Sequence, residues 1–538
     1  MVSRLCSFPV SQRLIKVLKV MRLMYVVRQI MCCNLAACCV KLIREMRTIF
    51  TPIFFTLFIF TACTSETNNS LGAEIEEIEK SLITTVQIDG ELPTKYTLLE
   101  RMEHYNVPGL SIAVIKGGKL HWAKGYGIAN VIKDEKVEVT TNTLFQAGSI
   151  SKPLAALSVL KLAEEGVLDI DENVNNYLKN WEIPDNEYTK EQKVTLRKIL
   201  SHTSGLTGHG FPGYPVNEPM PTLIQILNGE GNTPPVILDT IPGSIWRYSG
   251  GGYTVMEQVV ENVSGMNFEQ VMHSKILQPL KMTTSTYEQP LPENLESSAS
   301  IAYNRRGGAI DGLWHNYPEQ AAAGLWTTPT DLAKYCIEVQ DILAGKDNGI
   351  LSRESIELML TKELNSWGMG TSLKWDGDSL IFQHGGKNEG FTTEMMAFAY
   401  KGDGVIIMTN ADNGRPLIEE ILQSISTYYG WGIKKPTTID PYQTDPEQLK
   451  HLAGKYRYNE EGGPFPDVKG EFVVEVKVEN GKLRMNDPNG YLNSALAQIG
   501  ELEFIEMDGG LEILFHKNEE NNSYSFVLYD FIQFDKVE

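Results

Sequence analysis

The stretch Leu144-Phe145-Gln146-Ala147-Gly148-Ser149-Ile150-Ser151-Lys152-Pro153 decides how the rest of the chain is interpreted. Ser149 and Lys152 are three positions apart at the predicted start of a helix, so their side chains share one face about one turn apart. A lysine amine placed there reaches the serine hydroxyl, which needs a neighbouring base to act as a nucleophile. Free N–H groups at a helix N-terminus also favour an oxyanion. The spacing therefore predicts a serine nucleophile activated by a lysine.

The same four-residue spacing occurs again at Ser158 and Lys161. This second copy lies inside the apolar helix that is predicted to run from Ser149 to Gly166, and we interpret it as accidental. Pro153 suits the first turn of a helix, and Gly166 is placed to end it. Because this helix is apolar on most sides, we expect it to be central and buried.

A glycine-rich loop around Tyr248 carries a second group suited to this chemistry. Glycines let a tyrosine approach another segment closely. A phenol near an ammonium has its pKa lowered and relays a proton, which is the role we expect for Tyr248. The alternative is a packed loop tyrosine whose hydroxyl is satisfied locally.

A third segment, Phe382–Phe391, contains His384-Gly385-Gly386 followed by Lys387. We expect this motif at the start of a strand, where the two glycines let a substrate lie against bare backbone. Backbone N–H groups there can hold a developing oxyanion. The alternative is a structural histidine at a strand edge, and we expect the Lys387 side chain to be solvated rather than catalytic.

His202 and Ser204 also resemble a nucleophile pair, but spacing of two residues along a loop does not bring such side chains together dependably. We interpret both as structural. The chain has no G-x-S-x-G elbow, which speaks against an α/β-hydrolase.

Over residues 91–430 the ordered motifs resemble the serine β-lactamase and penicillin-binding-protein superfamily, in its class C β-lactamase-like branch. Four further segments match the family's sequence pattern: Leu162–Gly166, His202–Leu206, Ala323–Leu332 and Met408–Asn410. The resemblance implies an α/β fold, a mixed antiparallel sheet flanked by helices. It also implies an acylated Ser149, with Lys152 and Tyr248 jointly moving the proton and His384 in the family's Lys-Thr-Gly position. The oxyanion hole would be the N–H groups of Ser149 and Lys387, with Gly385 and Gly386 beside the substrate.

Two departures from the family's pattern affect the expected substrate. Gly250 replaces the asparagine of the Tyr-x-Asn motif, and His-Gly-Gly replaces Lys-Thr-Gly. Both changes make β-lactam hydrolysis less expected and fit esterases or peptidases acting on D-amino-acid or cell-wall peptides.

The resemblance implies no metal or organic cofactor. A non-catalytic protein that binds cell-wall peptides or a protein partner is the alternative, and a lipoprotein whose C-terminal domain carries the function is a third.

Charge and cysteine separate the first 63 residues from the rest. This segment has a net charge of +8, so the remaining residues carry −28 to give the total of −20. It also contains six of the seven cysteines, which leaves only Cys336 in the rest of the chain. Such an acidic body argues against nucleic-acid binding and lacks a disulfide framework.

Phe60-Thr61-Ala62-Cys63 follows an apolar run from Ile49 and resembles a bacterial lipobox. We therefore expect export and a lipid anchor at Cys63 on the bacterial membrane. We expect translation to start at Met46, the alternative being that the upstream stretch is a membrane-associating basic helix. An uncleaved anchor is the alternative for the whole segment.

Composition and turn signals divide the chain into further parts. We predict a tether over residues 64–90, a hydrolase domain over 91–430, a linker over 431–447 and a C-terminal β domain over 448–538. In the hydrolase domain, early strands around a Gly117-Gly118 turn and late strands over 379–410 are expected to build one sheet. In the C-terminal domain, Asn480-Gly481 and further turn signals predict repeated hairpins and a small antiparallel barrel or sandwich, similar to a lipocalin-like module.

Overall fold

The computed structural model describes residues 70–537 except 133–134, 347–348, 378, 459–464, 466–467, 469 and 521. The chain divides into two compact units, residues 1–77 and 78–538. The predictions for residues 1–63, including the lipid anchor at Cys63, lie outside the described residues. Within the described ranges, no helix combines the length and apolarity needed to cross a membrane. The described part of the expected tether contains a helix over residues 70–79 and strand β1 (Val86–Ile88), which pairs in parallel with β13 (Thr437–Ile439) from the expected linker.

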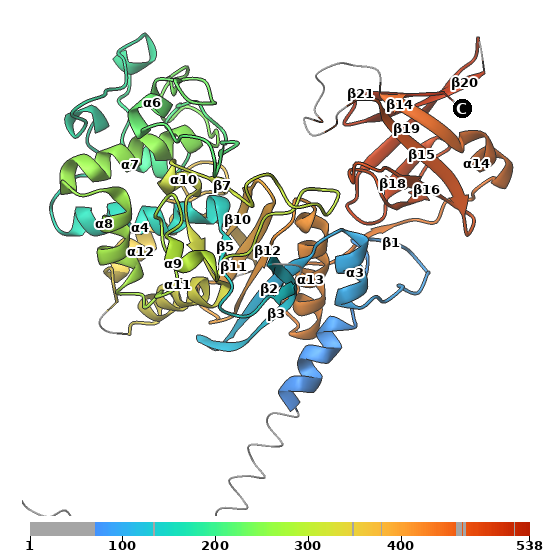
Figure 1. Cartoon of the computed structure of the whole chain (residues 1–538), viewed down its shortest axis with the longest axis horizontal. Helices are drawn as coiled ribbons and strands as arrows, with labels where there is room; N and C mark the ends of the chain where they lie inside the picture. Colours follow the sequence, from blue (N-terminus) through green and yellow to red (C-terminus); the bar gives the residue numbers. More distant parts are fainter. Residues whose placement is uncertain are drawn as a thin grey trace, which may run out of the picture. The chain divides into compact units, whose positions relative to one another are not determined.

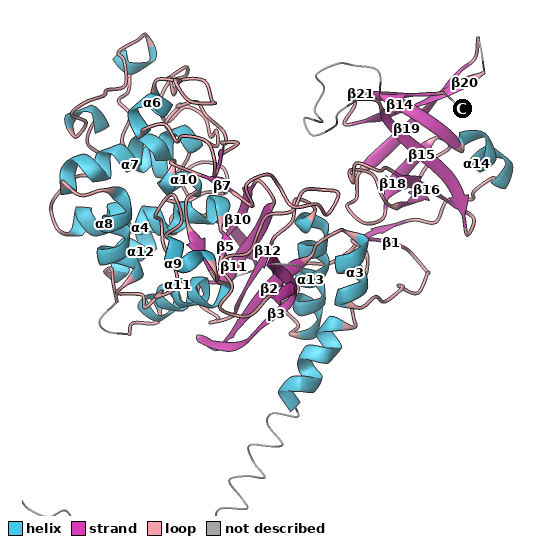
Figure 2. Ribbon diagram, in the orientation of Figure 1, coloured by secondary structure: helices cyan, strands magenta, loops and turns pink. Residues whose placement is uncertain are grey.

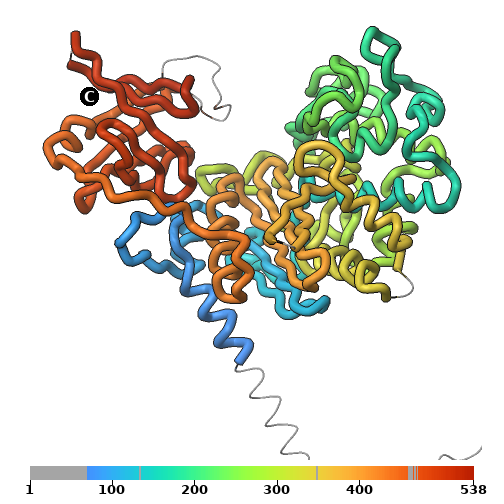
Figure 3. Tube along the Cα trace, turned by 180° about the vertical axis from the view of Figure 1, so that it is seen from behind, coloured from blue at the N-terminus to red at the C-terminus, as the bar shows by residue number. Residues whose placement is uncertain are grey.

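A seven-stranded sheet forms the centre of the hydrolase domain, in the order β4-β3-β2-β12-β11-β10-β9. Early and late strands lie side by side, as predicted, because β2 pairs antiparallel with β12, with Ile112 opposite Ile407 (Figure 1 and Figure 3). Gly117 and Gly118 both have positive φ and close the predicted β2–β3 hairpin. The strands are β2 (Gly109–Lys116), β3 (Lys119–Ile132), β4 (Glu135–Glu138), β9 (Ser372–Asp376), β10 (Ser379–Asn388), β11 (Phe391–Phe398) and β12 (Gly404–Thr409).

Helices cover both faces of this sheet (Figure 1). Helix α11 (Pro329–Leu343), which buries Cys336, packs on one face, and α13 (Gly414–Tyr428) with α3 (Leu98–His104) packs on the other. The predicted central helix is α4 (Ser151–Glu164), and Gly166 beyond its end has φ +71°. Every strand pair of this sheet is antiparallel, and an α/β fold with an antiparallel sheet flanked by helices is the fold class that the sequence predicted.

The hydrolase domain has further helices between β4 and β9 in the chain. The helices are α5 (Leu196–Leu200), α6 (Leu223–Leu227), α7 (Gly250–Ser264), α8 (Phe268–Met272), α9 (Glu293–Glu296), α10 (Gln320–Ala323) and α12 (Arg353–Met359). Among them, α7, α8 and α10 contact α4. Two small strand pairs join distant segments, β5 (Phe145–Gln146) with β8 (Trp326–Thr327) and β6 (Tyr214–Pro215) with β7 (His315–Asn316). The first pair fixes the chain entering α4 against the segment after α10.

The C-terminal β domain is a closed antiparallel barrel, one of the two forms predicted (Figure 2). Its core is aromatic, with Tyr456, Phe515 and Phe526 buried together. Asn480 and Gly481 have positive φ and close the predicted hairpin. The elements are α14 (Pro446–Leu452), β14 (Gly454–Tyr458), β15 (Phe472–Glu479), β16 (Lys482–Asn486), β17 (Ala495–Gln498), β18 (Glu503–Glu506), β19 (Glu512–Asn518), β20 (Ser523–Leu528) and β21 (Ile532–Lys536).

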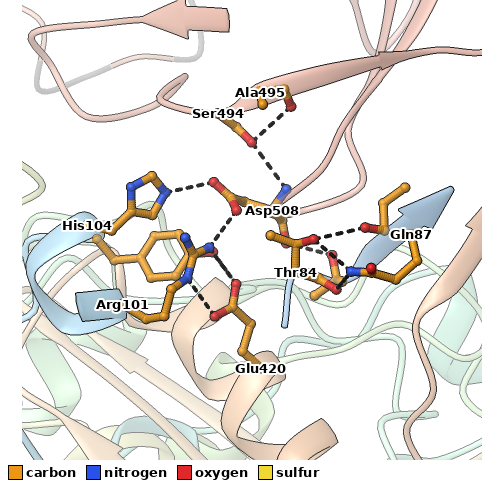
Figure 4. A network of polar contacts seen from close by, with 11 residues as sticks. Thr84, Gln87, Arg101, His104, Glu420, Ser494, Ala495 and Asp508 are labelled. Atoms are coloured by element: carbon orange, nitrogen blue, oxygen red, sulfur yellow. Dashed lines mark hydrogen bonds and ion pairs between the residues drawn. The ribbon is translucent and has the colours of Figure 1, made fainter. Parts of the chain in front are cut away.

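A buried ionic network joins the barrel to the sheet's helices (Figure 4). Arg101 on α3 donates to Glu420 on α13 at 2.6 Å and to Asp508, in the β18–β19 turn, at 2.5 Å. His104 contacts the second Asp508 oxygen at 2.7 Å. Because Arg101, Glu420 and Asp508 are buried, removing one partner would leave an uncompensated charge. The network therefore anchors the β18–β19 turn to the hydrolase domain.

Candidate active site

Ser149 and Lys152 are in contact, as the spacing predicted. Ser149 lies in the short 3-10 turn η1 (Gly148–Ile150) directly before α4. The Lys152 Nζ lies 3.0 Å from Ser149 Oγ and donates to the carbonyl of Ala322 at 2.7 Å. When the amine is neutral, its lone pair can accept the Ser149 proton while the bond to Ala322 keeps it aimed.

Burial lowers the pKa of Lys152 to about 7. The side chain is 2% exposed, and no carboxylate among the described residues forms an ion pair with it. Instead, the Nζ faces the rings of Tyr248 and Tyr253, 5.0 and 5.5 Å from their centroids. Because desolvation disfavours the ammonium, a large fraction of Lys152 is neutral near pH 7 and able to take a proton.

Tyr248 also lies at this site, but its predicted pKa change is wrong. Burial raises the pKa of the phenol, and an interaction with Ser149 opposes only part of that rise. The hydroxyl is buried and makes no hydrogen bond of good geometry among the described residues, so its approach to Ser149 falls short of a full hydrogen bond. The expected lowering fails because desolvation of the buried phenol outweighs the opposing interaction with Ser149. Tyr248 is therefore a neutral proton donor.

His384 faces the same cluster from strand β10, although the motif is not at the strand start that we expected. It is inside β10, because that strand runs from Ser379 to Asn388. The His384 Nδ1 lies 2.7 Å from the carbonyl of Gly385, which can only accept, so Nδ1 carries the hydrogen and Nε2 is left as an acceptor. Burial lowers the pKa of His384 to about 3, which keeps the ring neutral.

The two glycines of the motif allow three segments to meet. A Cβ on Gly386 would collide with the carbonyl of Ala147 and with Thr393. A Cβ on Gly148, which has φ +54°, would lie 2.6 Å from the Lys387 amide nitrogen. A Cβ on Gly385 would point to the other face, 2.8 Å from Arg415. Strand β10 therefore presses its backbone directly onto the turn that carries the serine.

The strand register directs the Lys387 N–H towards this turn. Glu389 and Gly390 form a two-residue turn, so Asn388 and Phe391 close the hairpin as a hydrogen-bonded pair. Hydrogen-bonded and non-hydrogen-bonded pairs alternate along an antiparallel ladder, so Lys387 and Thr392 form a non-hydrogen-bonded pair. The backbone N–H of Lys387 therefore points away from β11. Strand β9 ends its pairing at Gln383 and leaves this edge open. The open edge beside the Lys387 N–H is the arrangement that the expected oxyanion hole of Ser149 and Lys387 requires.

The Lys387 side chain does not enter the site. It forms an ion pair with Asp412 and is about half exposed, in agreement with a solvated rather than catalytic role. The second Ser-x-x-Lys copy is also separate, since Ser158 donates to Ala155 and Lys161 donates to Ile350.

His202 contributes more than the sequence indicated. It is fully buried, has φ +58°, and packs its ring 4.2 Å from that of Tyr248. Its Nδ1 accepts the N–H of Ser249 at 3.1 Å, which fixes the residue next to Tyr248. Ser204 binds the N–H of Leu206 instead, so the two do not form a nucleophile pair, as predicted.

Trp367 was missed altogether. Its ring lies 4.9 Å from that of His202, 5.3 Å from His384 and 5.8 Å from Tyr248, and it encloses the far side of the cluster. It follows α12 in a loop whose sequence carries no catalytic pattern, so nothing in the sequence could have indicated it.

Gly250, the first residue of α7, explains one departure from the family pattern. A Cβ there would lie 2.8 Å from the Phe211 ring. Phe211 thus occupies the space that an asparagine side chain would need, and the site has no amide group at this position.

A serine turn, a buried lysine, a tyrosine and an open strand edge define a class of acyl-transferring serine proteins. The Beta-lactamase family model matches residues 97–424, and the chain belongs to this family. Its members are generally serine hydrolases, and the geometry places this chain in the wider β-lactamase and penicillin-binding-protein superfamily.

Three relatives illustrate the breadth of the match. The chain is 23% identical over 324 residues to protein flp of Staphylococcus aureus strain MRSA252, covering 59% of this chain and 62% of that protein. It is 24% identical over 389 residues to penicillin-binding protein 4 of Amycolatopsis lactamdurans, covering 68% of this chain and 96% of the relative. The fold is similar, with a TM-score of 0.54 and 22% identity, to the octameric penicillin-binding protein homologue from Pyrococcus abyssi, over 82% of this chain and 98% of that one.

Proposed function

We propose that the protein is a serine hydrolase that forms an acyl-enzyme on Ser149 and acts on an ester, a D-amino-acid amide or a cell-wall peptide. The observation that carries the proposal is the 3.0 Å contact between Ser149 Oγ and a buried lysine whose pKa is lowered to about 7. A nucleophilic serine needs such a base beside it.

In the acylation step, Ser149 Oγ bonds to the substrate carbonyl carbon as neutral Lys152 takes the hydroxyl proton. The carbonyl oxygen becomes an oxyanion held by the N–H groups of Ser149 and Lys387. Tyr248 donates a proton to the leaving group as the bond to it breaks, and the proton on Lys152 restores the phenol. A water molecule then attacks the acyl-enzyme and gives the free acid and the starting serine.

His384 supports the substrate rather than transferring the proton in this scheme. Its Nε2 is buried, has no partner among the described residues, and accepts but does not donate. A substrate N–H or O–H beside the open edge of β10 would satisfy it. Because His384 stays neutral, it supplies no cation for the carboxylate of a β-lactam, which supports esters and D-amino-acid amides as the better substrates.

Hydrolysis of a panel of short esters and D-amino-acid amides tests this function. The wild-type protein should turn over at least one substrate, and Ser149→Ala should reduce that rate to background. Equal rates for the two proteins would refute the proposal.

A non-catalytic binding protein is the second candidate, because Phe211 fills the place of a substrate-binding amide at Gly250. Labelling by a fluorophosphonate or penicillin probe separates the two candidates. Attachment at Ser149 supports the enzyme, and a folded but inert protein supports the binder.

We also propose that the chain is exported and lipid-anchored through Cys63 on the outer side of a bacterial membrane, on the strength of the lipobox-like sequence Phe60–Cys63. Incorporation of labelled palmitate in the producing bacterium, lost in Cys63→Ala, is the expected result. Label that persists in this variant would refute the anchor.

A further inference from the structure

The guanidinium of Arg305 stands out because it has no acidic partner. Its Nη1 donates to Asn413 at 3.1 Å, and no carboxylate among the described residues forms an ion pair with it. Asn413 in turn donates to the Arg305 carbonyl at 2.6 Å, so the residue is held at both ends. A guanidinium has five N–H donors, which leaves most of the Arg305 donors available on a half-buried side chain.

The barrel supplies the surface on which this guanidinium rests. The Arg305 group lies 4.5 Å from the centroid of the Tyr491 ring. Asp487 accepts the N–H groups of Asn489 and Tyr491 at 2.7 and 2.8 Å, which fixes the loop that carries the ring. A Cβ on Gly490 would lie 2.6 Å from the Arg305 carbonyl, so the two segments are in close contact. Stacking on one face leaves the N–H edge of a guanidinium free to bind an anion.

Two hollows meet at this pair of residues. One cavity of about 310 Å³ is lined by Arg305 and Tyr491 together with Lys387 and Asp412. A second, of about 420 Å³, is lined by Arg305 and Tyr491 together with Glu389. Lys387 and Arg415, which also line the first cavity, are compensated, because Lys387 pairs with Asp412 and Arg415 pairs with Glu394. Among the described residues that line the first cavity, Arg305 is therefore the cation without a carboxylate partner, while Arg306, which also lines the second cavity, donates to Asn489.

Both hollows lie at the end of β10, because Lys387 lines the first and Glu389 lines the second. The backbone rises about 3.3 Å per residue, so Glu389 lies roughly 7 Å past Lys387. The chain leading to Arg305 crosses the strand end at this point, because a Cβ on Gly390 would collide with Ala302 and Tyr303. A group bound along β10 from Lys387 onward would thus end near Arg305.

The position of the proton donor Tyr248 indicates which half of a substrate extends towards Arg305. Tyr248 lies beside His384, with ring centroids 6.2 Å apart, at the earlier part of the open edge. The leaving group must be near Tyr248 to receive its proton. The acyl half of the substrate therefore extends in the opposite direction, from Lys387 towards Glu389.

We propose that Arg305, supported by the barrel residue Tyr491, is a specificity subsite for a carboxylate at the far end of the acyl group. The proposal rests on the proposed function and defines its substrates as acyl donors with a distal negative charge. A carboxylate would accept two parallel N–H bonds from the guanidinium. The barrel would then act in substrate selection.

Two esters that differ in one group test the subsite, the mononitrophenyl ester of suberic acid and its methyl ester, which lacks the distal charge. The wild-type kcat/KM should favour the free acid by about tenfold or more. Arg305→Gln should abolish this preference, and Tyr491→Ala should reduce it severalfold. Arg353→Gln is the matched control, since Arg353 is exposed on α12 and pairs with Glu357; it should retain both rates. No preference in the wild type, or a preference that survives in Arg305→Gln, would overturn the subsite.

A binding measurement separates the subsite from catalysis. The Ser149→Ala protein is titrated calorimetrically with monomethyl suberate and with dimethyl suberate. Tighter binding of the monoacid, lost when Arg305→Gln is added, supports the subsite even if no substrate is turned over. Equal binding of the two compounds refutes the subsite, while absence of Ser149-dependent hydrolysis refutes the proposed function alone.

Discussion

The amide nitrogen of Lys387 packs so closely against Gly148 that position 148 must be a glycine, because a Cβ there would lie 2.6 Å from this nitrogen. Strand β10 and the serine turn are thus fitted backbone to backbone. The two N–H groups assigned to the oxyanion hole depend on this fit, since a small shift of either segment would misalign them.

Gly148→Ala is expected to abolish most activity. The new methyl group must push Lys387 away, and φ +54° strains any residue with a side chain. We expect kcat to fall at least about 100-fold and the free energy of unfolding to fall by about 2 kcal/mol. Gly166→Ala is the matched control, with φ +71° but open space around the Cβ. It should cost about 1 kcal/mol and leave kcat unchanged, and equal loss of kcat in both variants would contradict the account.

The buried Lys152 should make activity and stability depend on pH. Its lowered pKa of about 7 predicts a rate that rises with pH through that region as the amine becomes neutral. The unfolded chain binds this proton up to the ordinary lysine pKa, so the wild type gains stability from about pH 7 to about 10.5 and is penalised below.

Lys152→Met should therefore lose activity. Below pH 7 its free energy of unfolding should exceed that of the wild type by about 5 kcal/mol, and the difference should vanish towards pH 10.5. Denaturant unfolding at several pH values measures this. Lys161→Met, which changes the accidental copy of the motif, should leave the rate and its pH dependence intact. A Lys152→Met protein whose stability relative to the wild type did not vary with pH would show that Lys152 stays charged.

His202 is expected to act through Tyr248. His202→Phe keeps an aromatic ring but removes the acceptor of the Ser249 N–H and introduces a residue ill suited to φ +58°. We expect about a tenfold fall in kcat with little change in KM, because the proton donor moves while the strand edge remains. Ser204→Ala removes a neighbouring hydroxyl that does not contact this loop; it should retain kcat, and a similar fall in both variants would point to general disruption of the turn.

The ionic network at Asp508 should contribute to stability in a pH-dependent way. Contacts with His104 and Arg101 outweigh burial and hold the pKa of Asp508 at about 2, below its ordinary value near 4. The resulting stabilisation is fully present above pH 4 and is lost as the pH falls through 2.

Asp508→Asn is expected to cost about 2 kcal/mol at neutral pH, measured by thermal or denaturant unfolding. The exposed pair between Glu91 and Lys482 is the control, and Glu91→Gln should cost less than about 1 kcal/mol. Equal costs would mean that burial adds nothing to the Asp508 contacts.

Local spacing was enough to predict much of this molecule. The contact between Ser149 and Lys152 follows from helix geometry, and the Gly117-Gly118 and Asn480-Gly481 hairpins follow from turn chemistry. The pairing of early with late strands followed from their alternation with the helical region. In each case the signal lies within a few residues or in the order of whole elements.

Other features depend on contacts between distant segments and could not be read from the sequence. The pKa of Tyr248 rises because His202 and Trp367 bury it, and neither neighbour is close in sequence. Asp508 lies in the turn between β18 and β19, and its partner Arg101 is some four hundred positions earlier in the chain. The length of β10 depends on its pairing with β11, which placed His384 inside a strand rather than at its start.

Covalent labelling tests the central claim most directly. The wild-type protein is treated with a fluorophosphonate probe between pH 5 and 9, and the modified peptide is identified by mass spectrometry. The account predicts one adduct on Ser149, formed at a rate that rises through about pH 7 and collapses in Lys152→Met. A folded wild-type protein that gains no adduct, or gains it at the same rate without Lys152, would contradict the account.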